Sequence, residues 1–241
     1  MSRFELTCFP TADELARTVA RGWLDEIESA NRAGRPHCVA LSGGRITQKF
    51  FAAVVEQANA RAVSFGTVHF FWADERCVPP DDPESNFRLA NELLFAPLKI
   101  SGGQIHRIRG ELPPDTAAAE AASEIGRVAP LNQNGQPVLD LIFLGMGEDG
   151  HVASLFPGEP ATTGADEAIY RAIGNSPKPP PNRITLSYPA IAAARQVWVL
   201  VSGAGKNAAL RQSLEEQGCT PLGRVTQIRT QTSIFCDFPP V

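Results

Sequence analysis

The sequence lacks any segment that would place it in or across a membrane. No window approaches the roughly eighteen uninterrupted apolar residues that a transmembrane helix needs. The first residues, MSRFELTCFPTADEL, contain no apolar run of the length found in a secretory signal peptide. We therefore expect a cytoplasmic protein with no membrane partner.

The chain also lacks paired cysteines and an excess of positive charge. Its five cysteines are scattered, odd in number and form no CxxC motif, so we expect reduced thiols rather than a disulfide framework or a zinc site. The formal net charge is −4 and the pI is about 5.6. A nucleic-acid partner is not expected, because such proteins carry a basic stripe, although a local basic pocket for a small anion remains compatible with this charge.

Helical and strand-like patterns alternate along almost the whole chain. With 241 residues and 43% hydrophobic content, the chain is long enough to bury a sizeable core, and we expect residues 1–241 to form a single domain. The patterns predict helices over 11–33, 46–60, 85–95, 115–129 and 206–216, and strands over 37–44, 67–75, 138–145, 183–191, 196–203 and 232–237.

The predicted strands are continuously apolar, as in sheets that are covered by helices on both faces. Together with the alternating order of elements, this predicts an α/β fold with a doubly wound, mainly parallel, Rossmann-like sheet. Ligands bind such sheets at the carboxyl ends of the strands. Four predicted strand ends carry glycine-rich or charged turns, at residues 42–45, 74–76, 145–151 and 202–206. The sequence therefore predicts a site at this edge of the sheet.

Two of these turns suit an anion. SGGRI offers the backbone N–H groups of Ser42, Gly43, Gly44 and Arg45 at a helix start, with the arginine as a fixed positive charge. SGAGK places Lys206 at a second helix start, where a cation opposes the helix dipole unless an anion is bound. The second turn is not a nucleotide-binding P-loop, because Leu200 stands where that motif needs glycine. Each turn alone also fits an ordinary surface loop.

The strand end at 74–76 reads Asp-Glu-Arg. It fits either a solvated, salt-bridged turn or a binding turn in which Arg76 holds an anion and Asp74 orients it or a hydroxyl group.

His151 differs from the other three histidines. His37, His69 and His106 lie in or beside predicted strands, where a structural role is expected. His151 lies in the glycine-dense turn GMGEDGH, two residues after Asp149, and a histidine titrates in the range that suits a general base. No second histidine or cysteine has metal-ligand spacing, and no G-x-S-x-G motif marks a nucleophilic serine.

Five segments, in order, resemble the glucosamine-6-phosphate isomerase/6-phosphogluconolactonase family over roughly residues 10 to 236. The more specific blocks are DLIFLGMGEDGHVASLFPG (140–158) and SPKPPPNRITLS (176–187); the others are LSGG (41–44), FFWADERCVPPDDPESNF (70–87) and VSGAGK (201–206). Phe156 stands where the deaminases of this family have a glutamate, so ASLFPG resembles the lactonase form. Arg45 and Ile46 replace the usual Ser-Thr, which removes a hydroxyl donor to phosphate.

The resemblance implies hydrolysis of a phosphosugar lactone, 6-phospho-D-glucono-1,5-lactone, to 6-phospho-D-gluconate in the oxidative pentose phosphate pathway, with no metal or other cofactor. It implies His151 as the base that activates water and Asp149 as its orienting partner. The N–H groups of Gly145, Met146 and Gly147 are expected to stabilise the oxyanion. The phosphate is expected on the Ser42–Arg45 turn, Arg76 and Lys206, with Arg183 at the rim.

Two other functions remain open at this stage. One is a deaminase or isomerase of the same fold, and the other is a non-catalytic phosphosugar-binding regulator. The sequence fits a monomer or a small homo-oligomer, and it leaves open whether residues 160–182 close over a substrate.

Overall fold

The central sheet has six parallel strands in the computed structural model, which describes residues 3–158 and 168–239. Its order is β1-β9-β8-β5-β2-β3, and each neighbouring pair is parallel. The strands are β1 (Phe4–Cys8), β2 (His37–Leu41), β3 (Val68–Trp72), β5 (Leu141–Gly145), β8 (Gln196–Val201) and β9 (Thr232–Cys236). The predicted α/β fold with a mainly parallel sheet is confirmed.

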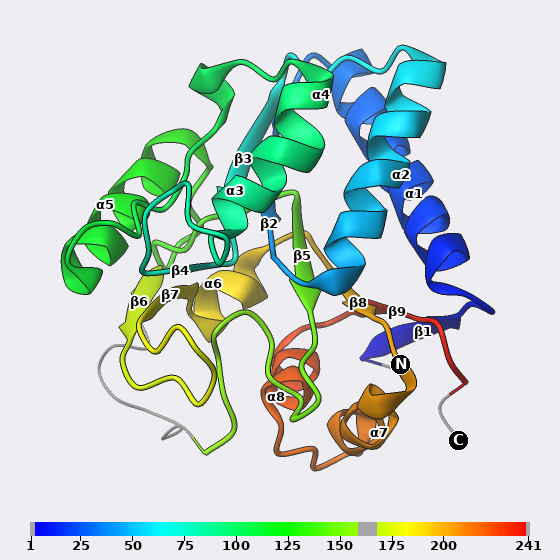
Figure 1. The fold of residues 1–241 in the computed structure, drawn as a ribbon, viewed down its shortest axis with the longest axis vertical. Coiled ribbons are helices and arrows are strands. Elements are labelled where there is room, and N and C mark those ends of the chain that lie inside the picture. The colour runs from blue at the N-terminus through cyan, green and yellow to red at the C-terminus, as the bar shows by residue number, and fades with distance from the viewer. Residues whose placement is uncertain (1–2, 159–167, 240–241) are drawn as a thin grey trace.

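Helices cover this sheet from two sides. Figure 1 shows α1 and α2 on one side of β2, β3 and β5, and α5 and α6 on the other. The helices are α1 (Ala12–Arg32), α2 (Arg45–Arg61), α3 (Asn86–Ala90), α4 (Ala96–Leu98), α5 (Pro114–Val128), α6 (Tyr188–Ala193), α7 (Asn207–Leu214) and α8 (Pro221–Ile228). No helix among the described residues is long and apolar enough to cross a membrane.

The core between α1, α2 and the sheet is aromatic. Leucine, valine, tryptophan and isoleucine recur every four residues along α1, which turns one apolar stripe toward the sheet. Trp23 on that stripe meets Phe143 of β5 edge-to-face, with ring centroids 5.2 Å apart. Phe50 of α2 lies 4.7 Å from the same ring. These contacts fix the start of α2 over β5, next to the turns at the carboxyl ends of the strands.

A second, smaller sheet was not predicted. It joins β4 (Asp74–Arg76), β7 (Arg183–Leu186) and β6 (Tyr170–Ile173) as antiparallel neighbours, in the order β4-β7-β6. The predicted strand over 67–75 is therefore two strands. Ala73 links them, because its N–H bonds to Leu41 of the large sheet and its carbonyl accepts from Leu186 of the small one.

The predicted strand over 183–191 is wrong in its second half. Strand β7 ends at Leu186, Ser187 caps α6 by accepting a hydrogen bond from the N–H of Ala190, and Pro189 lies in the first turn. A capping serine followed by an early proline is a helix-start signal. Strands β1 and β6 and helix α8 were also not predicted. Of the segment 160–182, residues 160–167 lie outside the described part of the chain.

The order of the sheet creates a crevice between β2 and β5. From β2 the chain passes to β3 on one side, whereas from β5 it continues to β8 and β9 on the other. A reversal of this kind separates the loops at the carboxyl ends of two neighbouring strands, and this is where α/β sheets bind ligands. The 42–45 turn follows β2, and the 145–151 turn follows β5.

Candidate active site

A pocket at this crevice gathers most of the residues singled out in the sequence. It encloses about 510 Å³, its open mouth included. Its lining contains four cations and one carboxylate among the described residues. The lining residues are Ser42, Gly43, Gly44, Arg45, Ile46, Asp74, Arg76, Gly145, Met146, His151, Ala153, Arg183 and Lys206. The excess of positive charge in the lining therefore suits an anionic ligand.

His151 and Asp149 form a directed pair in the turn after β5. The Nδ1 atom of His151 lies 2.5 Å from Oδ1 of Asp149, which also accepts the His151 backbone N–H. A carboxylate only accepts hydrogen bonds, so the imidazole proton belongs on Nδ1. The Nε2 atom is then left with a free lone pair, which is the form that a general base requires.

The N–H group of Gly147 is used differently from the prediction. Its N–H donates to the carbonyl of His151, so it is not available to an oxyanion, and Gly147 is not among the pocket-lining residues. The prediction of Gly147 as an oxyanion donor is wrong for this reason. A Cβ atom at this position would collide with the His151 ring. Glycine is therefore required here so that the imidazole can lie against the backbone.

The electrostatics of this turn favour a neutral imidazole. Burial lowers the pKa of His151 below its ordinary value, although Asp149 works in the opposite direction. Burial also works to raise the pKa of Asp149, but His151 and Lys178 together bring that pKa below its ordinary value. The pair is therefore a neutral imidazole beside an ionised carboxylate at neutral pH.

Lys178 belongs to this turn although it comes from the proline-rich segment. Its Nζ atom lies 3.7 Å from Oδ1 of Asp149, and its positive charge contributes to the lowered pKa of His151. In the sequence, this segment stood out only as part of the family resemblance, and no role was predicted for Lys178. The only signal in the sequence is a single cation among prolines, which restrict the backbone but do not place the lysine side chain.

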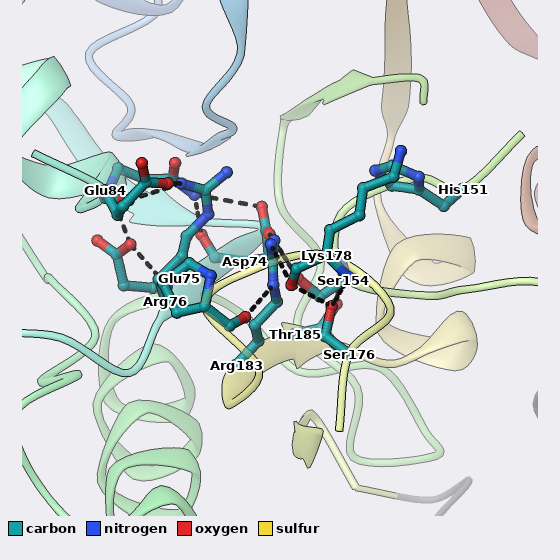
Figure 2. Close-up of polar contacts among 12 residues, drawn as sticks. Asp74, Glu75, Arg76, Glu84, His151, Ser154, Ser176, Lys178, Arg183 and Thr185 are labelled. Atoms are coloured by element: carbon teal, nitrogen blue, oxygen red, sulfur yellow. Dashed lines mark hydrogen bonds and ion pairs between the residues drawn. The ribbon is translucent and has the colours of Figure 1, made fainter. Parts of the chain in front are cut away.

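Arg183 explains how the proline-rich segment is held at the pocket. Its guanidinium donates to the carbonyls of Lys178, Pro179 and Pro180. Figure 2 shows the same side chain beside Asp74 and Ser154. Its NH1 atom lies 4.0 Å from Asp74, and burial lowers its pKa. Arg183 therefore lines the pocket, but most of its donors serve the protein.

Asp74 is a buried carboxylate with several partners. Ser154 donates to its Oδ2 at 2.7 Å, and the side-chain amide of Asn86 donates to its backbone carbonyl at 2.9 Å. Asn86 also packs against Gly43, where any Cβ atom would collide with its side-chain oxygen. This one asparagine thus fixes the turns after β2 and β3 relative to each other.

Glu75 anchors the start of α3 rather than the pocket. It is buried and accepts hydrogen bonds from the backbone N–H groups of Arg76, Asn86 and Phe87 and from the Ser85 hydroxyl. Burial raises its pKa to about 7, while the N–H donors favour its charged form. Its role is to hold Asn86 in position.

The opposite end of the pocket is cationic. Burial lowers the pKa of Lys206, and the nearby charge of Arg45 adds to this effect. Neither residue forms an ion pair with another described residue. The first turn of α2 has no side-chain cap, and the Ser42 hydroxyl is already donated to the carbonyl of Phe143. The backbone of this turn therefore offers unpaired N–H donors beside two cations, as anion sites do.

Arg76 joins the cationic side. Its NH1 atom is held by the carbonyl of Glu84 at 2.6 Å, and its buried Nε atom has no partner among the described residues. A buried donor without a partner is costly, and a bound anion would satisfy it.

The remaining histidines lie away from the pocket, as expected. His37 is buried and accepts from Trp23, and His69 and His106 hydrogen-bond to each other. In residues 3–158 and 168–239, no three His, Cys, Asp or Glu side chains are arranged to hold a metal ion.

Comparison with known proteins places this site in a family. The family model described as glucosamine-6-phosphate isomerases/6-phosphogluconolactonase matches residues 10–234. The chain belongs to this family. A relative from rice (Oryza sativa subsp. indica) named "Probable 6-phosphogluconolactonase 3, chloroplastic" is 36% identical over 240 residues, covering 95% of this chain and 72% of that protein.

Two more members of the family support the same resemblance. The 6-phosphogluconolactonase of Mycobacterium bovis is 36% identical over 202 residues, covering 82% of this chain and 81% of its own. The solved structure of 6-phosphogluconolactonase from Trypanosoma brucei superposes with a TM-score of 0.84 at 26% identity, covering 96% of this chain and 95% of its own.

Proposed function

We propose that this chain is a 6-phosphogluconolactonase, a carboxylic ester hydrolase that converts 6-phospho-D-glucono-1,5-lactone to 6-phospho-D-gluconate. The observation that carries the proposal is the arrangement of the pocket. His151, with a free Nε2 lone pair, lies in the same cavity as Arg45 and Lys206, which have no ion-pair partner among the described residues. A phosphorylated ester needs a base at one end and an anion site at the other.

His151 starts the reaction as a general base. Its Nε2 atom takes a proton from water as the water oxygen bonds to C1 of the lactone. The Nδ1 proton remains on Asp149's side of the ring, where the carboxylate stabilises the imidazolium. When the C1–ring oxygen bond breaks, the imidazolium returns the proton to that oxygen, so His151 ends neutral. Such acid–base help is worth about a hundred- to ten-thousand-fold in rate.

Negative charge develops on the C1 carbonyl oxygen as water attacks. Gly145 and Met146 line the pocket together with His151. We assign to their backbone N–H groups the stabilisation of this negative charge. Lys178 supplies a positive charge near the same turn. Donors at such a position are worth roughly 3–4 kcal/mol in the transition state.

The phosphate is assigned to the cationic end, on Lys206, Arg45, Arg76 and the N–H groups of the turn from Ser42 to Arg45. Asp74 accepts from a sugar hydroxyl, and Arg183 holds the proline-rich segment that brings Lys178 to the pocket. No metal or other cofactor is needed in this scheme, because the base is a side chain and the substrate already contains its leaving group.

Other aspects of the biology stay predictions. The cytoplasmic location is one of them, and the name of the rice relative places that protein in the chloroplast. The monomeric or small homo-oligomeric state and the single domain over 1–241 are others.

A lactonase assay tests the proposal. Freshly prepared 6-phospho-D-glucono-1,5-lactone is followed in a pH-stat, and the spontaneous rate is subtracted. We expect acid release well above that rate, no ammonia from glucosamine 6-phosphate, and no hydrolysis of the unphosphorylated lactone above its own spontaneous rate at the same concentration. Phe156 packs on His151 with ring centroids 4.8 Å apart, so that position offers no carboxylate for deaminase chemistry. Ammonia release, or a lactone rate equal to the spontaneous one, contradicts the proposal.

A further inference from the structure

Two cysteine thiols meet where the first and last strands of the sheet end. Cys8 is the last residue of β1, Cys236 is the last residue of β9, and the two are register partners. Their Sγ atoms lie 3.2 Å apart. Both strand ends lie on the side of the sheet away from β3 (Figure 1). We propose that Cys8 and Cys236 are an oxidation site that forms a reversible disulfide by exchange with a small-molecule disulfide such as glutathione disulfide.

The backbone geometry permits this bond. Neighbouring strands run about 4.8 Å apart, and disulfides join Cα atoms separated by about 4.4–6.8 Å. The sulfur atoms need to approach by roughly 1 Å to reach the length of an S–S bond. Because each cysteine ends its strand, this movement disturbs little of the hydrogen-bonded ladder. Among the described cysteines, no other pair has its sulfur atoms hydrogen-bonded.

The two sulfur atoms differ in access, which sets the order of steps. Cys8 is exposed, whereas Cys236 is buried and donates to the carbonyl of Phe238. Burial raises the pKa of Cys236 to about 12, and Cys8 adds to the rise. The Cys8 thiolate therefore attacks the oxidant first, since the thiolate is the nucleophile and needs access.

The exchange balances without any further reagent. Cys8 sulfur bonds to one sulfur of the oxidant, whose other half leaves as a thiolate and takes the proton that Cys8 released. Cys236 loses its proton, its sulfur bonds to Cys8 sulfur, and the second half leaves and is protonated. One oxidant disulfide is reduced to two thiols, and one protein dithiol is oxidised to one disulfide.

The bond would form next to a support of the cationic end of the pocket. Asp237, which follows Cys236, accepts from the Ser202 hydroxyl at 2.5 Å and from the Gly203 N–H at 2.9 Å. Gly203 begins the turn that ends at Lys206. A disulfide at Cys236 therefore fixes the backbone beside this carboxylate and closes a loop of most of the chain, which restricts the unfolded state.

Oxidation of the full-length protein tests this directly. The reduced protein is incubated with glutathione disulfide, remaining thiols are alkylated, and the peptides are mapped by mass spectrometry. We expect a peptide pair joined through Cys8 and Cys236, and a Tm about 5 °C or more above that of the reduced protein. Dithiothreitol should reverse both changes. The readouts are independent of lactone hydrolysis, so they stand or fall separately from the proposed function.

Two variants provide the control. Cys8→Ser, at an exposed position, should lose both the joined peptides and the Tm rise. Cys219→Ser removes the other exposed thiol, which donates to the carbonyl of Gln217, and should keep both. A wild-type protein that holds glutathione on Cys8 while Cys236 stays alkylatable overturns the proposal. So does a crosslink through Cys219, or a Tm rise that survives in Cys8→Ser.

Discussion

The two ends of the pocket handle charge in opposite ways. At the His151 end, each charged group has a partner within the protein, because Asp149 pairs with His151 and Lys178. At the Lys206 end, Lys206 and Arg45 have no ion-pair partner among the described residues, and burial, together with the charge of Arg45, lowers the pKa of Lys206. The pairing with Asp149 fixes the position of the proton on His151. The cations at the Lys206 end are available to bind an anion. The difference assigns chemistry to one end and binding to the other.

Replacement of His151 should have the largest effect. For His151→Ala we expect kcat to fall by about a hundred- to ten-thousand-fold, because the general base is lost, while KM changes by less than about threefold. Steady-state kinetics on fresh lactone measure both values. His69→Ala is the matched control, since His69 lies away from the pocket, and it should keep normal kcat. Full turnover in His151→Ala would show that His151 is not the general base.

Replacement of Lys206 should have the opposite signature. For Lys206→Ala we expect KM to rise by about ten- to a hundred-fold with kcat nearly unchanged, because a charged hydrogen bond is lost equally from substrate and transition state. Lys49→Ala controls for loss of a surface lysine, since Lys49 on α2 pairs with Asp13 in solvent. A fall in kcat at constant KM would show that the two ends do not divide the work in this way.

Replacement of Ser154 tests the buried contact with Asp74, which lies between the two ends of the pocket. Ser154→Ala leaves Asp74 without its 2.7 Å donor inside the protein, so we expect the free energy of unfolding to fall by about 1–3 kcal/mol. Urea denaturation measures this change. Ser176→Ala is a comparison at a less buried serine of the proline-rich segment and should cost less. Equal losses of unfolding free energy for the two variants would show that the contact with Asp74 contributes no more to stability than a contact of a less buried serine.

Replacement of Lys178 should shift the pH dependence of the activity. The neutral form of His151 is the active one, so wild-type kcat/KM should hold through pH 7 and fall only as pH drops below about 6.5, because burial lowers the pKa of His151. Lys178→Met removes a charge that helps to lower this pKa, so the pKa rises and the fall in activity begins at higher pH. The pH profile measures it. Coincident pH profiles for the two proteins would show that Lys178 has no effect on the pKa of His151.

The sequence predicted every strand of the large sheet except β1, and most of the pocket, because both depend on local patterns. Continuous apolar runs predicted the buried parallel strands, and the turns that follow β2, β5 and β8 contain the glycines and charges that the structure gathers. Register, sheet order and the position of the switch between β2 and β5 depend on the topology, but the rule that ligands bind at the carboxyl ends of strands already made these turns candidates.

The small sheet and Lys178 could not be predicted in the same way. Strands β4, β6 and β7 are short, and β4 lies far along the chain from β6 and β7, so no local pattern marks the pairing of β4 with β7. The bend at Ala73 leaves no trace in the apolar run that precedes Asp74. Lys178 reaches Asp149 only because Arg183 holds the carbonyls of residues 178–180, which is a tertiary contact. The wrong prediction for Gly147 has the same origin, since its N–H is taken by a residue four positions on.

A structure with 6-phospho-D-gluconate bound would test the division of the pocket most directly. The account predicts phosphate oxygens within hydrogen-bond distance of Lys206 Nζ and the N–H groups at the start of α2, and the C1 carboxylate next to Nε2 of His151. A ligand bound in the reverse direction, with phosphate on His151 and the carboxylate on Lys206, or bound outside this pocket, would contradict it.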